Sequence, residues 1–305
     1  MFAVNVVVLC GIVVTGGVVR LTSSGLGCPT FPECTTGSLV PLAHQVQGWH
    51  KFVEFGNRML TFVVVIAAAA ALVAAWRLRP RRTPLVRLAA VGVAGIFAQA
   101  LLGGVDVLTH LNPYVTSAHF LLSIALIAVG VALWQRSGDD GDGPPQPLVR
   151  PEVAWLTWAL VAWAALVIVL GTLVTGSGPH SGDAHAASRY PFDLRSVAWL
   201  HADAVLLFFG LLLATIVAVR LTTCPAATAR RLWVLLVVAL GQGLIGYTQY
   251  FTRLPAALVG LHLAGATVLW VAALCVPFTL RRREAPAASG AAPMDRDTPA
   301  TTITA

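Results

Sequence analysis

Apolar residues occur along the chain in eight long runs separated by short polar connections. The runs cover residues 2–19, 52–76, 87–109, 114–135, 153–175, 195–219, 232–252 and 256–280. Each is close to the roughly 20 residues that an α-helix needs to cross the hydrocarbon core of a bilayer. The pattern therefore predicts an all-α polytopic membrane protein with eight transmembrane helices.

Basic residues are concentrated in alternate connections between these runs. The richer connections hold Arg77, Arg79, Arg81, Arg82, Arg87, Arg136, Arg150, Arg220, Arg230, Arg231, Arg281, Arg282 and Arg283. The opposite connections hold only Arg20, Lys51, Arg189, Arg195 and Arg253. Because short loops rich in Lys and Arg stay in the cytoplasm, we expect a multi-pass protein of the cell membrane with both termini cytoplasmic.

The first apolar run resembles a signal peptide only in its position. It has no basic residue before it and no small-residue cleavage site after it, so we interpret it as a transmembrane helix. Because the chain begins almost directly in this run, we expect residue 1 to lie inside the first helix and the true start codon to lie upstream.

Composition agrees with a membrane location and argues against a nucleic-acid-binding protein. The chain is 57% hydrophobic and 11% charged, whereas soluble domains carry about 25% charged residues. The net charge of +7 would suggest nucleic acid as a partner of a soluble protein. Here the arginines lie in the short connections, where they set the topology, and no nucleotide-binding or nucleic-acid-binding motif is present.

Two segments differ in composition from the apolar runs. Residues 137–151 are polar and rich in Gly and Pro, which indicates a cytoplasmic linker between an N-terminal half, 1–136, and a C-terminal half, 152–281. Residues 282–305 are rich in Ala, Pro and Thr, a composition typical of a disordered tail.

Two cysteines flank the sequence CPTFPEC in the first outer loop. Cys28 and Cys34 lie on the side of the membrane that is expected to be oxidising, which favours a disulfide that closes a short loop. A zinc site is disfavoured, because the spacing differs from the usual one and no second pair of ligands follows.

The two halves contain an internal repeat. AQALLGGVDVLTHLNPYVTSAHFLLS at 98–123 matches GQGLIGYTQYFTRLPAALVGLHLAGA at 241–266 with a constant offset of 143 residues, so that Gln99 corresponds to Gln242. Parallel repeats of this kind are common in membrane proteins. We therefore expect two pseudo-symmetric four-helix bundles with the same orientation.

Three of the eight histidines, His119, His201 and His262, lie well within apolar runs. The repeat places His119 opposite His262, and a second match with an offset of 144 places Asn57 opposite His201. Each histidine is six or seven residues from the outer end of its run, or about 10 Å deep. Two imidazoles that face one another across a helix bundle are a typical axial ligand pair for b-type heme.

A histidine inside the membrane can also have a role unrelated to heme. A single one often forms a hydrogen bond to a neighbouring helix, and zinc would require Cys or carboxylate ligands at the same depth. Repeat-related positions on different helices favour heme. The pattern therefore predicts that His201 and His262 bind heme b.

The N-terminal half differs at the corresponding positions. His119 has Asn57 as its repeat-related partner, and His50, two turns before Asn57, is an alternative ligand near the outer surface. Glu54 lies one turn before Asn57, where the second half has Ala198. We expect a closed bis-His site in the C-terminal half and an open site with an acidic residue in the N-terminal half.

Several of these segments resemble the heme A synthase family, in its actinobacterial-type form. They are GGVVRLTSSGLGCP at 16–29, EFGNR at 54–58, QALLGG with LTHLNPYVTSAHF at 99–120, and the two C-terminal histidine helices. The resemblance covers nearly all of residues 1–280. It implies an oxidoreductase of cytochrome oxidase assembly that converts the C8 methyl of heme o to a formyl group by successive hydroxylations.

The resemblance also implies roles for individual residues. Heme b would lie between His201 and His262, and His119 would bind the iron of the substrate heme o. Glu54 matches the family's functionally important glutamate. Cys28 and Cys34 match its outer-loop disulfide, for which a redox role has been suggested. Asn57 departs from the family pattern, because many members have His in the E-x-x-H-R motif.

A second departure lies in the outer loop at 176–193. Some relatives carry a pair of cysteines there, whereas this chain has His180 and His185, which we expect to face solvent.

Two alternatives concern charged residues at the outer interface. A carboxylate of Glu54 near the heme edge would stabilise positive charge or accept a proton, whereas the structural alternative pairs it with Arg58 or a polar neighbour. Arg58 and Arg20 are expected to contact either heme propionates or lipid phosphates.

Two further functions compete with heme A synthase. A b-type electron carrier predicts two equal pairs of histidines, which Asn57 and the unmatched Glu54 contradict. A heme transporter or chaperone predicts a polar path and an energy-coupling feature, and the sequence shows neither. The expected partners are the lipid bilayer, heme O synthase as the source of heme o, the cytochrome oxidase assembly machinery and a second copy of the chain in a homo-oligomer.

Overall fold

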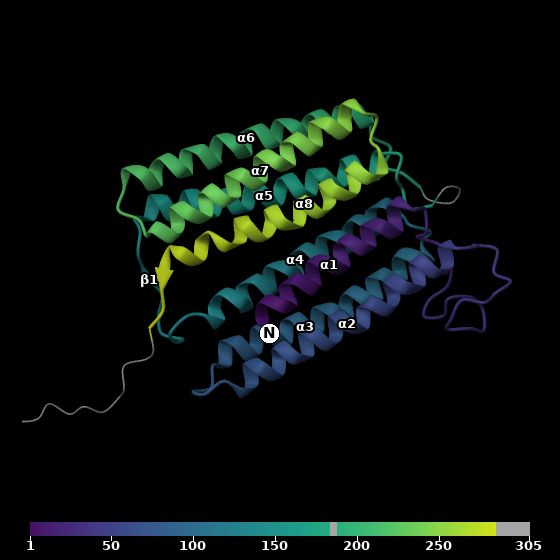
Figure 1. The fold of residues 1–305 in the computed structure, drawn as a ribbon, viewed down its shortest axis with the longest axis horizontal. Helices are drawn as coiled ribbons and strands as arrows, with labels where there is room; N and C mark the ends of the chain where they lie inside the picture. Colours follow the sequence, from purple (N-terminus) through teal and green to yellow (C-terminus); the bar gives the residue numbers. More distant parts are fainter. Residues whose placement is uncertain (184–187, 285–305) are drawn as a thin grey trace, which may run out of the picture.

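A computed structural model describes residues 1–183 and 188–284, so His185 and residues 285–305 of the expected tail lie outside the described part. Eight helices follow in chain order (Figure 1). They are α1 (Phe2–Leu21), α2 (His50–Arg77), α3 (Thr83–Leu108), α4 (Pro113–Ser137), α5 (Pro151–Ser177), α6 (Leu194–Leu221), α7 (Ala226–Phe251) and α8 (Ala256–Cys275). Within the described residues, all eight are long and apolar enough to cross a membrane, which confirms the predicted fold class.

Helix ends follow local capping chemistry. Asn112 precedes α4 and its side chain accepts a hydrogen bond from the backbone N–H of Tyr114, while Pro113 occupies the first helical position, where no N–H is needed. Asp193 precedes α6 and accepts from the N–H of Ser196 at 2.8 Å. These hydrogen bonds, with that from the Ser196 hydroxyl, lower the pKa of Asp193 and fix the start of the helix.

Two predicted boundaries were several residues off. The run predicted at 232–252 corresponds to α7, which begins at Ala226, and the run predicted at 87–109 corresponds to α3, which begins at Thr83. Both helices start within polar sequence, because backbone hydrogen bonding continues past the point where the side chains become charged. The run 256–280 was predicted as one helix, but it divides into α8 and a short 3-10 turn at Pro277–Thr279.

The helices contact one another mainly within two groups. In the first group α1 contacts α2 and α4, and α3 contacts α2 and α4; in the second α6 contacts α5 and α7, and α8 contacts α5 and α7. Between the groups, α8 packs on α1 and α4, and α4 also packs on α5 (Figure 1). The pseudo-symmetry of two bundles stays a prediction, as do the domain boundaries.

The interface between the groups is largely apolar and includes a hydrogen bond from a buried indole. The indole N–H of Trp270, on α8, donates to the carbonyl of Ile124, on α4, at 2.9 Å. Leu263 packs against Gly17 of α1, where an added Cβ would come within 3.0 Å of its side chain. Small residues at such crossings let membrane helices approach closely.

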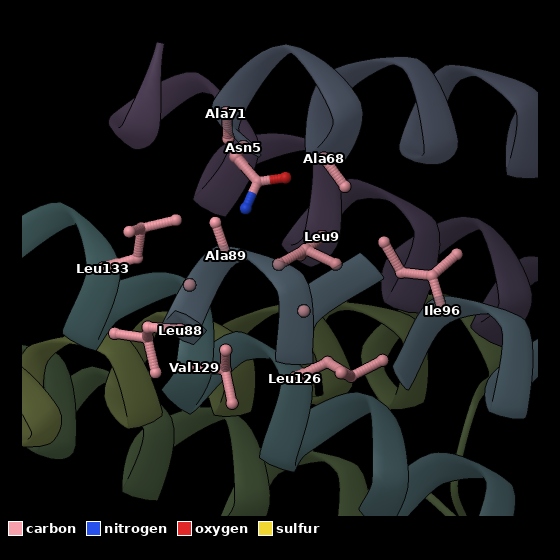
Figure 2. A pocket seen from close by; sticks show the side chains of 12 residues that line it. Asn5, Leu9, Ala68, Ala71, Leu88, Ala89, Ile96, Leu126, Val129 and Leu133 are labelled. Atoms are coloured by element: carbon pink, nitrogen blue, oxygen red, sulfur yellow. The ribbon is translucent and has the colours of Figure 1, made fainter. Parts of the chain in front are cut away.

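A cavity of about 10 Å³ lies among α1, α2, α3 and α4 (Figure 2). Its lining is apolar apart from Asn5, whose side-chain oxygen is buried and has no hydrogen-bond partner among the described residues. A space of this size accommodates about one water molecule. The first four helices are therefore closely packed at this depth.

The segment between α4 and α5 is folded against the end of the chain. Strand β1 (Gln146–Pro147) pairs antiparallel with β2 (Arg281–Arg282). Arg82 donates to the carbonyls of Arg136, Asp139 and Gly141 and pairs with Asp142 at 3.0 Å. Arg282, which the sequence placed in the tail, thus belongs to a structured contact with the linker.

At the opposite end, Arg20 of α1 connects the two groups of helices. Its guanidinium donates to the carbonyl of Thr175 at 2.9 Å and to that of His180 at 2.6 Å. Nearby, the hydroxyl of Tyr190 donates to the carbonyl of Pro113 at 2.9 Å. These bonds tie the loop after α5 to the N-terminal helices.

Replacing Arg20 by Met should destabilise the protein by about 2 kcal/mol, because two partly buried carbonyls lose a charged donor. Arg195→Met, at an exposed position near the same end, is the matched control and should stay within about 0.5 kcal/mol of the parent. Thermal unfolding in detergent micelles measures both variants. Equal stability of the two would contradict this role of Arg20.

Candidate heme sites and the outer loop

The three predicted histidines lie on different helices, each in the second or third turn: His119 on α4, His201 on α6 and His262 on α8. Each imidazole rests against a glycine of a neighbouring helix, where an added Cβ would lie 2.9–3.4 Å from the ring carbon Cε1. The pairs are His119 with Gly103, His201 with Gly171, and His262 with Gly246. These glycines leave space for the ring beside the neighbouring backbone.

The hydrogen bonding of these rings suits metal ligation. The Nδ1 atoms of His119, His201 and His262 are buried and form no hydrogen bond of normal geometry within the described residues. The ring of His201 also lies near the backbone of Val167. A neutral imidazole with its proton on Nδ1 presents the lone pair of Nε2. Each ring is therefore suited to bind an axial position of heme iron through Nε2.

The repeat has the same hydrogen bond in both halves. The amide of Gln99, on α3, donates to the carbonyl of His119 at 2.8 Å, and that of Gln242, on α7, donates to the carbonyl of His262 at 2.7 Å. These residues correspond at the predicted offset. The backbone at each histidine is thus held to the preceding helix by the same side chain.

The partners of the two repeat-related histidines differ. His201 lies on α6 and His262 on α8, and both of these helices pack against α5 and α7. Asn57, the residue that corresponds to His201, accepts a hydrogen bond at its Oδ1 from the hydroxyl of Thr15 on α1 at 2.8 Å. Asn57 is therefore engaged with a neighbouring helix.

His50, the alternative ligand, is engaged as well. It is the first residue of α2, its Nδ1 lies 2.9 Å from the hydroxyl of Ser24, and its ring stacks on that of Trp49. These contacts assign it to the packing of the outer loop.

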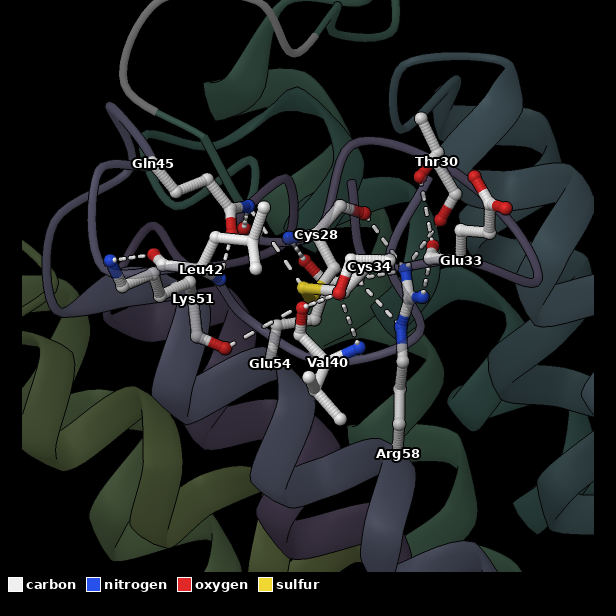
Figure 3. The surroundings of a disulfide bond; sticks show 12 residues. Cys28, Thr30, Glu33, Cys34, Val40, Leu42, Gln45, Lys51, Glu54 and Arg58 are labelled. Carbon is white, nitrogen blue, oxygen red and sulfur yellow. Dashed lines mark hydrogen bonds and ion pairs between the residues drawn. A yellow bond between two sulfur atoms is a disulfide. The ribbon is translucent and has the colours of Figure 1, made fainter. Parts of the chain in front are cut away.

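Glu54 is buried, and both of its carboxylate oxygens are bonded to protein groups (Figure 3). Oε2 accepts from the backbone N–H of Cys28 at 2.6 Å, and Oε1 accepts from Arg58 at 2.6 Å. Arg58 also donates to the carbonyls of Cys28, Thr30 and Glu33 at 2.8–3.1 Å. The structural alternative for Glu54, pairing with Arg58, is the arrangement that the structure shows.

The loop held by this pair contains the two predicted cysteines. The sulfurs of Cys28 and Cys34 lie 2.01 Å apart, and both side chains are fully buried (Figure 3). Lys51, a residue that the sequence assigned only to topology, is 4% exposed and donates to the carbonyls of Leu42 and Ala43. In the sequence, only the position of Lys51 one turn before Glu54 indicated that it helps to hold the outer loop.

A glycine fixes how closely the loop approaches α2. A Cβ at Gly27 would collide with the backbone of His50 and would lie 2.8 Å from the backbone nitrogen of Lys51. Only glycine fits this contact, which accounts for the glycine before Cys28 in the sequence.

Two expectations concern the outer surface. Contacts of Arg20 and Arg58 with heme propionates or lipid phosphates stay a prediction; in the structure, their guanidinium groups donate to backbone carbonyls of the outer loops and, for Arg58, to Glu54. His180 was expected to face solvent, but it is half-buried and its Nε2 lies 2.9 Å from the carbonyl of Leu254. Backbone carbonyls in loops and at helix ends accept hydrogen bonds from these groups.

Comparison with known proteins identifies relatives of the chain. A family model described as "Cytochrome oxidase assembly protein", COX15-CtaA, matches residues 1–274. The heme A synthase of Geobacillus kaustophilus is 33% identical over 119 residues, 39% of this chain and 36% of that protein. The heme A synthase of Lysinibacillus sphaericus is 28% identical over 187 residues, 59% of this chain and 57% of that protein.

A third relative, the heme A synthase of Listeria monocytogenes serovar 1/2a, is 29% identical over 196 residues, 63% of this chain and 62% of that protein. The aligned part of the chain thus spans between about one third and somewhat less than two thirds of the length of these relatives. The family match, in contrast, covers the helices that carry all three histidines. The chain therefore belongs to the COX15-CtaA family of cytochrome oxidase assembly proteins.

Proposed function

We propose that the chain is a heme A synthase, an oxidoreductase that converts the C8 methyl of heme o to a formyl group by successive hydroxylations. The observation that carries the proposal is the set of three histidines on α4, α6 and α8. Each is packed against a glycine, and each has a buried Nδ1 without a hydrogen bond of normal geometry among the described residues. The family match and the named relatives support the same reaction.

Under this proposal the C-terminal half binds the resident cofactor. His201 and His262 would hold heme b through their imidazole rings, and Gln242 fixes the backbone at His262. Bound heme b supplies one-electron transfer. The helices that carry these histidines, α6 and α8, both pack against α5 and α7, which supports this assignment.

The N-terminal half binds the substrate in the same proposal. His119 would bind the iron of heme o, and Asn57, the residue that corresponds to His201 in the repeat, offers no imidazole as a second ligand. Because Asn57 is bonded to Thr15, it keeps α1 and α2 together beside this site. The difference between the halves supports one permanent heme and one exchangeable heme, and it disfavours an electron carrier with two equal hemes.

Catalysis by Glu54 stays a prediction, and its contacts also support a positioning role. Its carboxylate and Arg58 hold the loop that contains Cys28 and Cys34 over the first turns of α2. The proposed setting is the cell membrane, with both termini cytoplasmic because the arginine-rich connections lie on their side. Heme O synthase would supply the substrate, and cytochrome oxidase assembly would consume the product.

Co-expression with heme O synthase in a host that lacks heme A tests the proposal. Extracted hemes are separated by chromatography, and we expect heme A to appear in addition to heme b. His119→Ala should abolish heme A formation while heme b stays bound. Heme o that persists unchanged beside a well-folded protein would refute the proposed reaction.

A further inference from the structure

Five arginines gather at the end of the molecule where α4 ends and where β2 follows α8 (Figure 1). They come from three places in the sequence: the residue before α3, the last turn of α4, and the segment after the 3-10 turn. They are Arg82, Arg136, Arg281, Arg282 and Arg283. The heme sites lie toward the other end of the helices and do not explain this cluster.

Two of the five arginines are neutralised by neighbouring carboxylates. Arg82 pairs with Asp142 at 3.0 Å and also donates to linker carbonyls. Arg282 lies 3.4 Å from Asp140 and 3.9 Å from Glu284, and it is exposed. These pairs balance the charges of Arg82 and Arg282.

The other three arginines lack a close carboxylate among the described residues. Arg281 and Arg283 alternate with exposed neighbours along the extended segment, and both are half-buried, as expected for residues on the same face of a strand. Arg136 has only Asp142 at 4.0 Å, which already pairs with Arg82. These three side chains form what we call the inner arginine group.

Donor groups in the inner arginine group are left without acceptors. The Nε atoms of Arg136 and Arg283 are buried and have no hydrogen-bond partner within the described residues. Arg283 donates from another nitrogen to the carbonyl of Gly143 at 2.7 Å, and Arg281 lies over the ring of Phe278. Buried donors without acceptors are uncommon in native proteins and commonly indicate an acceptor that binds there.

The charge balance around the group is positive. Asp139 is the carboxylate that interacts electrostatically with Arg136, Arg281 and Arg283, and burial raises its pKa although these arginines oppose the change. Burial lowers the pKa of Arg281, and the charges of Arg283 and Arg136 lower it further. The five arginines thus meet four carboxylates, Asp139, Asp140, Asp142 and Glu284, so an added anion would relieve the remaining repulsion.

We infer that Arg136, Arg281 and Arg283 form a binding site for a phosphate group at the membrane surface. Guanidinium groups match phosphate oxygens with paired N–H donors, which explains the preference for Arg over Lys at such sites. The group lies at the ends of two transmembrane helices, where basic clusters bind anionic lipid headgroups. Phosphatidylglycerol and free phosphate share this chemistry, and the experiment distinguishes them.

Native mass spectrometry of the full chain in detergent tests the site, with phosphatidylglycerol and phosphatidylcholine as probes. We expect tighter retention of phosphatidylglycerol, and binding about tenfold weaker in Arg281→Gln/Arg283→Gln. The matched control is Arg77→Gln/Arg230→Gln, which removes two exposed arginines at the same end and should bind like the parent. Inorganic phosphate is titrated in parallel, with the melting temperature as readout.

Each outcome decides the inference. Loss of phosphatidylglycerol binding in the double variant but not in the control pair supports a lipid site. A phosphate-induced rise in melting temperature that is lost in the double variant supports a soluble phosphate ligand. Arg136→Gln leaves β2 intact and should weaken binding as well, which covers the case that the double variant does not fold. Equal binding by the parent, Arg136→Gln and the control pair, with both probes, would overturn the site.

Discussion

Replacing His262 with alanine should remove the bis-histidine spectrum of heme b from the purified protein. The imidazole is packed against Gly246, and glycine has no side chain that could replace the ring as a ligand. Loss of a group that merely orients a metal ligand costs about 10–100-fold in affinity. Loss of the ligand itself should exceed that range. Absorption spectra of the reduced and oxidised protein, with heme quantified after extraction, measure the effect.

Three further variants show whether the effect is specific to the ligands of heme b. His201→Ala should have the same effect, whereas His119→Ala should keep the heme b spectrum, because His119 belongs to the other half. His110→Ala is the matched control, since His110 is an exposed histidine at a loop. Retention of the bis-histidine spectrum in a folded His262→Ala protein would exclude His262 as a ligand of heme b.

Much of this fold follows from the apolar runs, because each run is long enough to require a helix of its own. The repeat adds three-dimensional information: the offset that relates Gln99 to Gln242 predicts equivalent positions, and both amides bond the carbonyl of the aligned histidine. The apolar runs and the repeat can be recognised in the sequence, because the first depend on neighbouring residues and the second on a duplicated segment.

Contacts between distant loops were not predictable in the same way. Arg20 meets carbonyls about 155 residues later in the chain, and a carbonyl has no sequence signature. The strand pair of Gln146–Pro147 with Arg281–Arg282 is too short to produce an alternating pattern. For Glu54, the sequence offered both catalysis and pairing with Arg58. The structure shows the pair, and catalysis by Glu54 stays a prediction.

The Glu54–Arg58 pair leads to the second large prediction: Arg58→Ala should destabilise the protein by about 3 kcal/mol. The change leaves a buried carboxylate without its cation and three loop carbonyls without a donor. The value is at the low end for a broken buried pair, because the Arg58 side chain is 21% exposed. Thermal unfolding measures the loss, and thiol labelling without reductant measures how completely Cys28 and Cys34 are joined. Arg253→Ala, an exposed change at the same end, is the control.

Glu54→Gln separates positioning from chemistry at the same site. The amide keeps an oxygen acceptor but loses the charge, so we expect a smaller loss of stability than in Arg58→Ala, with the cysteine pair still joined. If Glu54 acts through the loop, conversion of heme o should fall more in Arg58→Ala than in Glu54→Gln, in the same order as the stability. If Glu54→Gln is fully stable and its cysteines are joined but heme A is absent, then the carboxylate takes part in the reaction directly. That result would refute the positioning role, because the loop would be in place while the chemistry was lost.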